Sequence, residues 1–213
     1  MQLINSQENT GISIKNNLNQ VKPALCVDID NVIAKTDEVM RKVIYEHSRS
    51  KVKLEYEDVV CFEYWKCRDG SGQRFDKSEW KKIHQEFTHN YLLKITPFDN
   101  VARYMKILCT KYDIHLATSR LNDGQEATRL WLSQHEIPFK KLHFVQEGTK
   151  HLINENFVAA IEDDREQGYA FNSKGIRVFL LAHPWNVVGP HSPLKRVTDW
   201  EQLTHELLSL NLL

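Results

Sequence analysis

The sequence predicts an α/β fold in which helices flank a mostly parallel sheet. Two observations support this: short apolar runs recur along the chain, and segments with helical periodicity lie between several of them. Strands that alternate with helices form parallel sheets, because each helix carries the chain back to the start of the next strand. The chain has 213 residues, 41% of them hydrophobic, which is enough for one such domain with a modest insertion.

The first strand is expected at 24–29, where a short apolar run ends in carboxylates. Four more apolar runs of similar length follow it, at 114–117, 142–145, 157–161 and 178–181. Open parallel sheets bind their ligands at the carboxyl ends of the strands. Polar residues that follow these runs are therefore candidates for a functional site.

Three helices are expected to cover the sheet and close the domain. One begins near Asn100, and the next begins at 122–125, where capping residues precede an apolar stripe that includes Leu130 and Trp131. Thr198 lies in a capping pattern that opens the last helix. We expect this last helix to seal the C-terminal end of the domain.

A long stretch after the first strand interrupts the alternation and is predicted to be an inserted helical unit. Thr36 is expected to cap one of its helices, and Ser78 is expected to cap another. The first residues of the chain are polar and lack periodicity. The predicted division is a tail or edge element at 1–20, a core at 21–35 and 96–213, and the inserted unit at 36–95.

The overall composition argues against two classes of partner. Lys and Arg total 28, as do Asp and Glu, so the chain lacks the basic surplus of proteins that bind mainly polynucleotide backbones. No apolar run approaches the roughly 20 residues that span a bilayer, and the polar start lacks a signal-peptide core. The four cysteines lack the spacing of a zinc site. We expect a cytoplasmic protein that binds no membrane.

Asp28 and Asp30 lie two residues apart where the first strand gives way to a loop. Side chains two apart on an extended backbone point the same way, so both acids are expected to face one site. One carboxylate can then attack a substrate while its neighbour handles the proton of the leaving group.

Three further elements follow other predicted strands. Thr118, Ser119 and Arg120 come after the second strand, and Lys150 lies in the loop between two later ones. Hydroxyl groups and a cation are suited to hold a phosphoryl group. The strand from Phe157 runs directly into the acids Glu162, Asp163 and Asp164. Such clustered carboxylates indicate a hard cation, and Mg²⁺ suits a site that also holds a phosphate.

These elements, in this order, resemble the four motifs of the haloacid dehalogenase superfamily of hydrolases. The matching residues are Asp28 and Asp30, Thr118, Lys150, and Asp163 with Asp164. The resemblance implies a Rossmann-like sheet with a helical cap inserted after the first core strand. Members that keep the second acid of the first motif are usually phosphatases, so Asp30 favours hydrolysis of a phosphomonoester.

A narrower resemblance points to the 5′(3′)-deoxyribonucleotidase branch and its bacterial relatives. It rests on four short segments: 28–34, 118–120, 131–139 and 183–186. The resemblance implies a small phosphorylated substrate, with a 5′- or 3′-nucleotide as one candidate. Phosphatases for sugar phosphates or nucleic acid ends are the alternatives within this chemistry, and a binding or regulatory protein without turnover is the alternative outside it.

The resemblance also implies roles for the individual residues. Asp28 attacks phosphorus to form an aspartyl phosphate, and Asp30 first protonates the leaving oxygen and then activates water. The implied ligands of Mg²⁺ are the Asp28 carboxylate, the Asp30 carbonyl and Asp164, with Asp163 bound directly or lying just outside the ligand set. Residues implied to hold the phosphoryl oxygens are Thr118, Ser119 and Lys150, with Arg120 or Arg165 as an added charged contact.

Aromatic residues of the inserted unit are candidates for substrate contacts. Phe62, Tyr64 and Trp65 could stack on a base, whereas the helical spacing around Trp80 is typical of a core residue. A slot for a base needs exposed aromatic side chains, while a pocket for a sugar phosphate would be smaller and more polar. The resemblance implies that the inserted cap decides the substrate.

Overall fold

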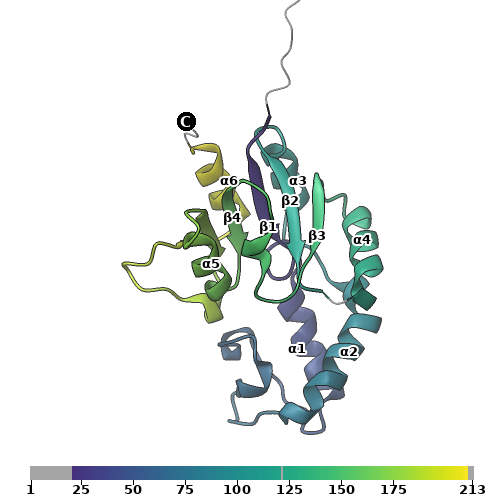
Figure 1. Cartoon of the computed structure of the whole chain (residues 1–213). Coiled ribbons are helices and arrows are strands. Elements are labelled where there is room, and N and C mark those ends of the chain that lie inside the picture. Colours follow the sequence, from purple (N-terminus) through teal and green to yellow (C-terminus); the bar gives the residue numbers. More distant parts are fainter. Residues whose placement is uncertain (1–20, 121, 211–213) are drawn as a thin grey trace, which may run out of the picture.

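A computed structural model describes residues 21–120 and 122–210, so the predicted tail at 1–20 lies outside the described residues. Within the described part, six parallel strands form one sheet in the order β3-β2-β1-β4-β5-β6 (Figure 1). The strands are β1 Ala24–Asp28, β2 Asp113–Thr118, β3 Lys141–Phe144, β4 Phe157–Glu162, β5 Arg177–Leu181 and β6 Lys195–Val197. The predicted Rossmann-like α/β class is confirmed.

The five predicted strands are present, and a sixth was not predicted. The edge strand β6 has three residues, two of them cationic, so it lacks the apolar run that marks the others. The first strand ends at Asp28, one residue earlier than expected, because Ile29 begins a tight turn. In that turn the Ile29 carbonyl accepts hydrogen bonds from the backbone amides of Ile33 and Ala34, both at 3.0 Å.

Helices cover both faces of the sheet unequally. The helices are α1 Thr36–His47, α2 Trp80–Asn90, α3 Val101–Leu108, α4 Gln125–Gln134, α5 Arg165–Asn172 and α6 Trp200–Leu208. Alternate residues of β1 point to opposite faces. Val27 belongs to the large cluster with α3, α4 and α6, and Cys26 belongs to the smaller cluster with α5.

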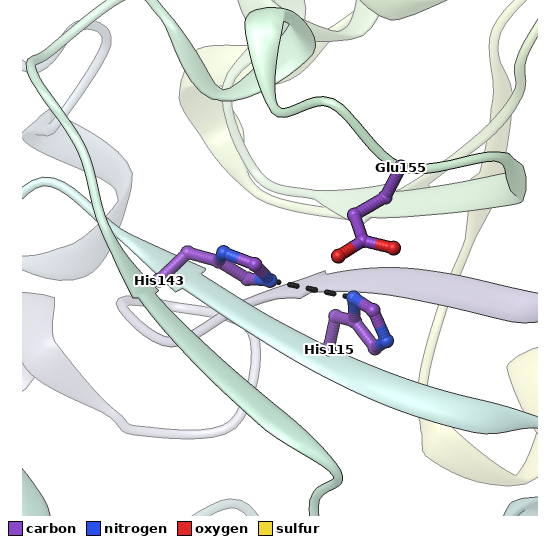
Figure 2. Close-up of side chains that lie close together, drawn as sticks. All are labelled: His115, His143 and Glu155. Atoms are coloured by element: carbon purple, nitrogen blue, oxygen red, sulfur yellow. Dashed lines mark hydrogen bonds between the residues drawn. The ribbon is translucent and has the colours of Figure 1, made fainter.

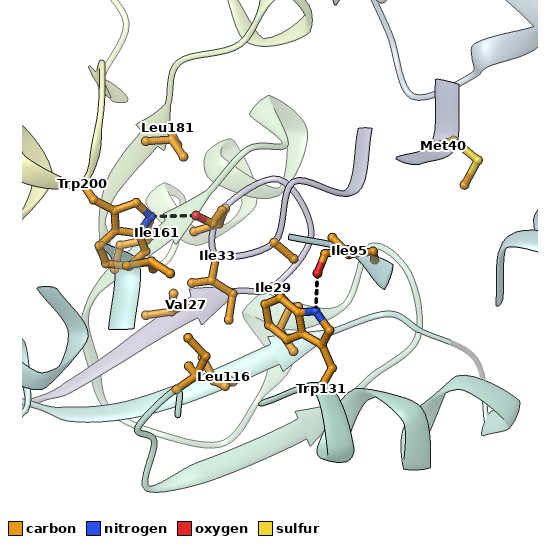
Figure 3. Packing of buried hydrophobic residues seen from close by; sticks show 14 of the residues in the cluster. Val27, Ile29, Ile33, Met40, Ile95, Leu116, Trp131, Ile161, Leu181 and Trp200 are labelled. Carbon is orange, nitrogen blue, oxygen red and sulfur yellow. Dashed lines mark hydrogen bonds between the residues drawn. The ribbon is translucent and has the colours of Figure 1, made fainter. Parts of the chain in front are cut away.

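Two tryptophans tie the large cluster to the loops around it. The indole nitrogen of Trp131 donates to the Ile95 carbonyl at 2.7 Å, and that of Trp200 donates to the Val32 carbonyl at 2.8 Å (Figure 3). Both indoles are buried and have a hydrogen-bond partner, as buried tryptophans usually do. The predicted burial of Leu130 is wrong: it is 47% exposed, because α4 buries Thr128, Trp131 and Leu132 instead.

The segment 36–95 leaves and rejoins the sheet at one point. The Lys35 amide donates to the Thr96 carbonyl at 2.9 Å, and Ala34 forms a bridge with Pro97. Figure 1 shows α1 and α2 beyond the end of the sheet at which β1 ends. The described part of the chain contains no helix long and apolar enough to cross a membrane.

Both predicted helix caps in this segment are wrong. Thr36 lies inside the first turn of α1, and its hydroxyl donates to Asp30 at 2.6 Å instead of capping the helix. Asp76 accepts from the Ser78 amide at 2.7 Å and caps the short 3₁₀ turn that precedes α2. The Thr36 hydroxyl therefore contributes to the functional site described below.

Candidate active site

The acids and hydroxyls singled out in the sequence meet at the carboxyl edge of the sheet. β1 lies between β2 and β4, so Asp28, Thr118 and Glu162, at the ends of these three strands, come together. Asp28 is paired in register with Ala117, the residue before Thr118. The hydrogen-bond register of a parallel sheet thus fixes the position of each side chain.

Lys150 lies between two buried carboxylates. Its ammonium nitrogen is 2.6 Å from Asp28 and 3.0 Å from Glu162, and all three side chains are almost fully buried. Burial alone would lower the pKa of Lys150, but the two carboxylates raise it above its ordinary value. Burial raises the pKa of Asp28, while Lys150 opposes that shift. The site therefore holds a permanent cation against the carboxylate predicted to be the nucleophile.

Asp30 is held by a different cation. Arg120 donates to both Asp30 oxygens, at 2.8 and 3.1 Å, and the hydroxyls of Thr36 and Thr118 reach the same carboxylate at 2.6 and 3.4 Å. Burial raises the pKa of Asp30, but Arg120 and the hydroxyl bonds outweigh it and lower the pKa below its ordinary value. The two acids of the first motif therefore have opposite electrostatic surroundings.

A second group of acids offers oxygens to a cation. Oxygens of Asp28, Glu162 and Asp163 lie within 4.8 Å of one another. One oxygen of Glu162 and one of Asp163 are buried without a hydrogen-bond partner among the described residues. Burial raises the pKa of both acids. Buried carboxylate oxygens without partners fit a hard divalent cation such as Mg²⁺.

Asp163 belongs to the close group of acid oxygens described above, whereas Asp164 does not. Asp164 begins α5 as its N-terminal cap, and its carboxylate accepts from the Glu166 amide at 2.8 Å. Asp163 is instead fixed through its backbone, because the Asn186 side-chain amide donates to the Asp163 carbonyl at 2.9 Å and to the Leu181 carbonyl at 2.7 Å. Asn186 is the last residue of the segment 183–186. Its hydrogen bond to the Asp163 carbonyl orients the loop that carries Asp163 and Asp164.

The acids lie beside a cavity of about 480 Å³. We call Asp28, Asp30, Lys150, Glu162 and Asp163 the charged floor, and all of these but Glu162 line the cavity. The cavity is also lined by residues of the inserted segment, and we call four of them the aromatic wall: Phe62, Tyr64, Trp65 and Trp80. The three aromatic residues predicted as substrate contacts thus face the same cavity as the predicted nucleophile.

Three members of the aromatic wall contact one another, and the fourth, Phe62, packs against Trp185. Tyr64 and Trp80 stack with ring centroids 5.8 Å apart, and Trp65 lies tilted at 5.4 Å from Trp80. The Tyr64 hydroxyl donates to Asp37 at 3.0 Å, so this ring is fixed from both sides. Trp80, expected in the core, is only partly buried and lines the cavity.

Some predicted contacts are not brought into the cavity. Arg165 is exposed, pairs with Glu166 and donates to the Val187 carbonyl, and it does not line the cavity. Arg120 lines it but is committed to Asp30. Ser119 lines the cavity, whereas Thr118 is fully buried beneath Asp30.

Two residues of the site were missed at the sequence level. Glu162 was noted as an acid, but its pairing with Lys150 depends on how the loop before β4 folds back along that strand, which the sequence does not display. His84 on α2 lines the cavity and carried no motif. Its position, one helical turn after Trp80, was the available signal.

The fold is similar to that of solved haloacid dehalogenase-like proteins. A haloacid dehalogenase-like hydrolase from Streptococcus pneumoniae aligns with a TM-score of 0.60 at 8% identity, over 89% of this chain and 99% of that one. CbbY from Rhodobacter sphaeroides in complex with phosphate aligns with a TM-score of 0.55 at 17% identity, over 86% and 96%. A putative beta-phosphoglucomutase from Thermotoga maritima aligns at 0.53 and 16%, over 88% and 99%.

Sequence comparison identifies the family. No curated protein matches the chain. The family model described as 5′ nucleotidase, deoxy (Pyrimidine), cytosolic type C protein matches residues 22–211, which is nearly the whole chain. The predicted superfamily, branch and phosphatase class are thereby confirmed. The chain belongs to this family of haloacid dehalogenase-type phosphatases.

Proposed function

We propose that this protein is a Mg²⁺-dependent phosphomonoesterase that forms an aspartyl phosphate on Asp28 and acts on a small nucleotide. The observation that carries the proposal is the contact of Asp28 with Lys150, 2.6 Å apart on the floor of a cavity with an aromatic wall. A carboxylate beside a buried cation and a group of acids is suited to attack a phosphoryl group.

Four cysteines without disulfides fit a cytoplasmic location.

In the first half of the proposed reaction, a carboxylate oxygen of Asp28 attacks phosphorus. The bond between phosphorus and the ester oxygen breaks, and that oxygen takes a proton from Asp30. Asp30 is 31% exposed on its side chain and lines the cavity, so it can reach a leaving group. Because Arg120 favours the carboxylate form of Asp30, this step requires the pairing to loosen when the substrate binds.

In the second half, water attacks phosphorus and frees the Asp28 carboxylate. Asp30 accepts the proton of the water, a role that its pairing with Arg120 favours. Lys150 and Ser119, which line the cavity, would hold the phosphoryl oxygens throughout. Asp28, Asp163 and the Asp30 carbonyl would hold Mg²⁺, with Asp164 as the alternative ligand. The bound ion would neutralise the charge that otherwise repels an anionic nucleophile.

The aromatic wall supports a nucleotide as the substrate. We propose that the segment 36–95 acts as the cap of the core 21–35 and 96–213. Phe62 is 38% exposed, and both Phe62 and Trp65 line the cavity, which supports contact of these rings with a base. A sugar phosphate is the second candidate, because His84 and Thr88 add polar groups to the same wall of the cavity.

Phosphate release from a panel of 5′- and 3′-nucleotides, sugar phosphates and phosphorylated DNA ends tests the proposal. We expect release from nucleotides in Mg²⁺ and its loss in EDTA, with recovery when Mg²⁺ is restored. Faster release from sugar phosphates or DNA ends would support those alternatives over a nucleotide. Pure folded protein that releases phosphate from no compound would contradict the proposal and favour a binding role.

A further inference from the structure

A second group of metal-ligating side chains lies outside the active site. His115 is on β2, His143 is on the neighbouring edge strand β3, and Glu155 lies in the loop just before β4. One nitrogen of each imidazole and one oxygen of the carboxylate lie within 4.8 Å of one another. Figure 2 shows the Glu155 carboxylate directed toward the space beside the two rings.

The distance between the two histidine nitrogens fits a small tetrahedral ion. Nδ1 of His115 and Nε2 of His143 are 3.3 Å apart. Zn²⁺ binds histidine nitrogen at about 2.0–2.1 Å, so two such ligands on a tetrahedron lie roughly 3.3–3.4 Å apart. The same separation is long for a hydrogen bond between two nitrogens. Two histidines and one glutamate with an open fourth position form a known type of zinc ligand set.

The protonation states of the three side chains also suit a cation. Burial lowers the pKa of His115 and of His143, which keeps both imidazoles neutral with a lone pair available. Lys141 holds the pKa of Glu155 below its ordinary value, which keeps it a carboxylate. Lys141 is also a competitor, because its ammonium group pairs with the same carboxylate that a metal would bind.

The group is spatially separate from the charged floor. His115 precedes Thr118 by three residues on β2, which is about 10 Å along a strand. His115 pairs with Cys26 in the sheet and packs edge-on against Phe157, so it lies on the face of the smaller apolar cluster. His143 and Glu155 are only partly buried, which leaves the group open to solvent from the sheet edge.

We propose that His115, His143 and Glu155 form a binding site for a divalent transition metal of the zinc class. The site would connect two strands to the loop that carries Lys150. Lys150 begins a short 3₁₀ turn that ends at Leu152, three residues before Glu155. A metal bound at Glu155 therefore restrains the loop that places the cation of the active site, and it stabilises the folded chain by binding only that state.

Zinc binding by the full-length protein in excess Mg²⁺ tests the site. Competition with a chromophoric zinc chelator gives the affinity, and thermal unfolding with and without Zn²⁺ gives the stabilisation. We expect His143→Gln and Glu155→Gln each to weaken Zn²⁺ binding at least about 10-fold, since loss of groups that merely support a ligand costs that much. Lys141→Gln should tighten binding by removing the competing charge.

His191→Gln is the matched control, because His191 is an exposed histidine outside the group. It should leave the zinc affinity and the zinc-induced rise in melting temperature unchanged. Glu155 lies in a loop, so its variant tests the site even if His143→Gln fails to fold. Zinc affinity that is equal in the parent protein, His143→Gln and Glu155→Gln, or no zinc binding by the parent, would overturn the proposal. Phosphatase activity is not needed for either readout.

Discussion

The charged floor and the aromatic wall face the same cavity but are positioned by different forces. The floor acids lie at or just beyond strand ends, where sheet register fixes them, and buried ion pairs hold Lys150, which comes from a loop, against two of them. The wall is built from Phe62, a short 3₁₀ turn and the start of α2, where ring packing fixes it. From this difference we expect the floor to set the reaction and the wall to set which molecule is presented to it.

The largest expected effect comes from removing the nucleophile. We expect Asp28→Asn to lower kcat by at least about 1000-fold, because an amide cannot attack phosphorus and the groups of the floor act together. The substitution is nearly isosteric, so the fold should remain. Phosphate release measures the loss of activity, and circular dichroism shows whether the fold remains.

The matched control for this variant is Asp113→Asn. Asp113 begins β2 at the opposite end of the sheet and pairs with Lys140 on the surface. It should retain the activity of the parent protein. Substantial turnover by Asp28→Asn would reject Asp28 as the nucleophile, although the cavity could still bind the substrate.

The second effect tests whether the floor is held by charge. Lys150→Met leaves the carboxylates of Asp28 and Glu162 buried without their cation. Breaking a buried pair in this way costs about 3–5 kcal/mol of unfolding free energy, and activity should be lost with it. Urea unfolding gives the free energy. Lys106→Met removes an exposed pair with Glu136 and should cost about 0–1 kcal/mol, so equal losses would contradict the prediction.

The same difference explains what could be predicted from the sequence. Five apolar runs predicted five strands and the parallel sheet. Two of these runs lead into carboxylates, which predicted the approach of Asp28 to Asp163, because parallel strand ends meet at one edge of the sheet. The strand β6 escaped detection because its three residues carry two charges. Pairs such as Lys150 with Glu162 depend on the path of a loop, which periodicity does not encode.

The aromatic wall was predicted less completely, for a related reason. Phe62, Tyr64 and Trp65, the candidate substrate contacts, line the cavity, but helical spacing assigned Trp80, which also lines it, to the core. Periodicity identifies the face of a helix that is covered. It does not distinguish a face that packs on the sheet from one that borders a cavity, because both exclude much of the solvent.

A third prediction concerns the joint between the two regions. His183 donates from Nε2 to the Asn31 carbonyl beside the floor and accepts at Nδ1 from the Tyr56 hydroxyl of the inserted segment, both at 2.8 Å. Burial lowers the pKa of His183 to about 4. The unfolded chain binds a proton below about pH 6.5, whereas the folded protein does not, so stability is lost as the pH falls from about 6.5 to 4.

The unfolding free energy that this histidine accounts for, and that is lost over this pH range, is about 3 kcal/mol. We expect the unfolding free energy of the parent protein to fall more steeply between pH 7 and pH 4 than that of His183→Asn. Urea unfolding at several pH values measures both slopes. His205→Asn removes an exposed histidine on α6 and should keep the slope of the parent. If the unfolding free energy fell equally steeply with pH in the parent protein and in His183→Asn, the prediction for His183 would be wrong.

A fourth prediction separates the two acids that follow β4. Asp163→Asn should weaken Mg²⁺ activation by about 10- to 100-fold, because Asp163 contributes a buried oxygen without a hydrogen-bond partner to the acid group. Asp164→Asn should change it less, because its carboxylate caps α5. Measuring the activity of each variant at increasing Mg²⁺ concentration gives its Mg²⁺ activation constant. A larger effect of Asp164→Asn would restore Asp164 as the direct ligand.

The smallest expected effect addresses the aromatic wall alone. Stacking of a base on an aromatic side chain is worth about 1–3 kcal/mol, so Phe62→Ala or Trp65→Ala should raise KM for a nucleotide by roughly 10-fold while kcat changes little. Phe139→Ala is a closely matched control, because Phe139 is 39% exposed, compared with 38% for Phe62, and lies outside the cavity. A phosphate ester without a base, such as a sugar phosphate, should show no KM increase in either wall variant. Equal increases for both substrates would mean that the wall shapes the cavity without contacting a base, and the division between a reactive floor and a selective wall would then fail.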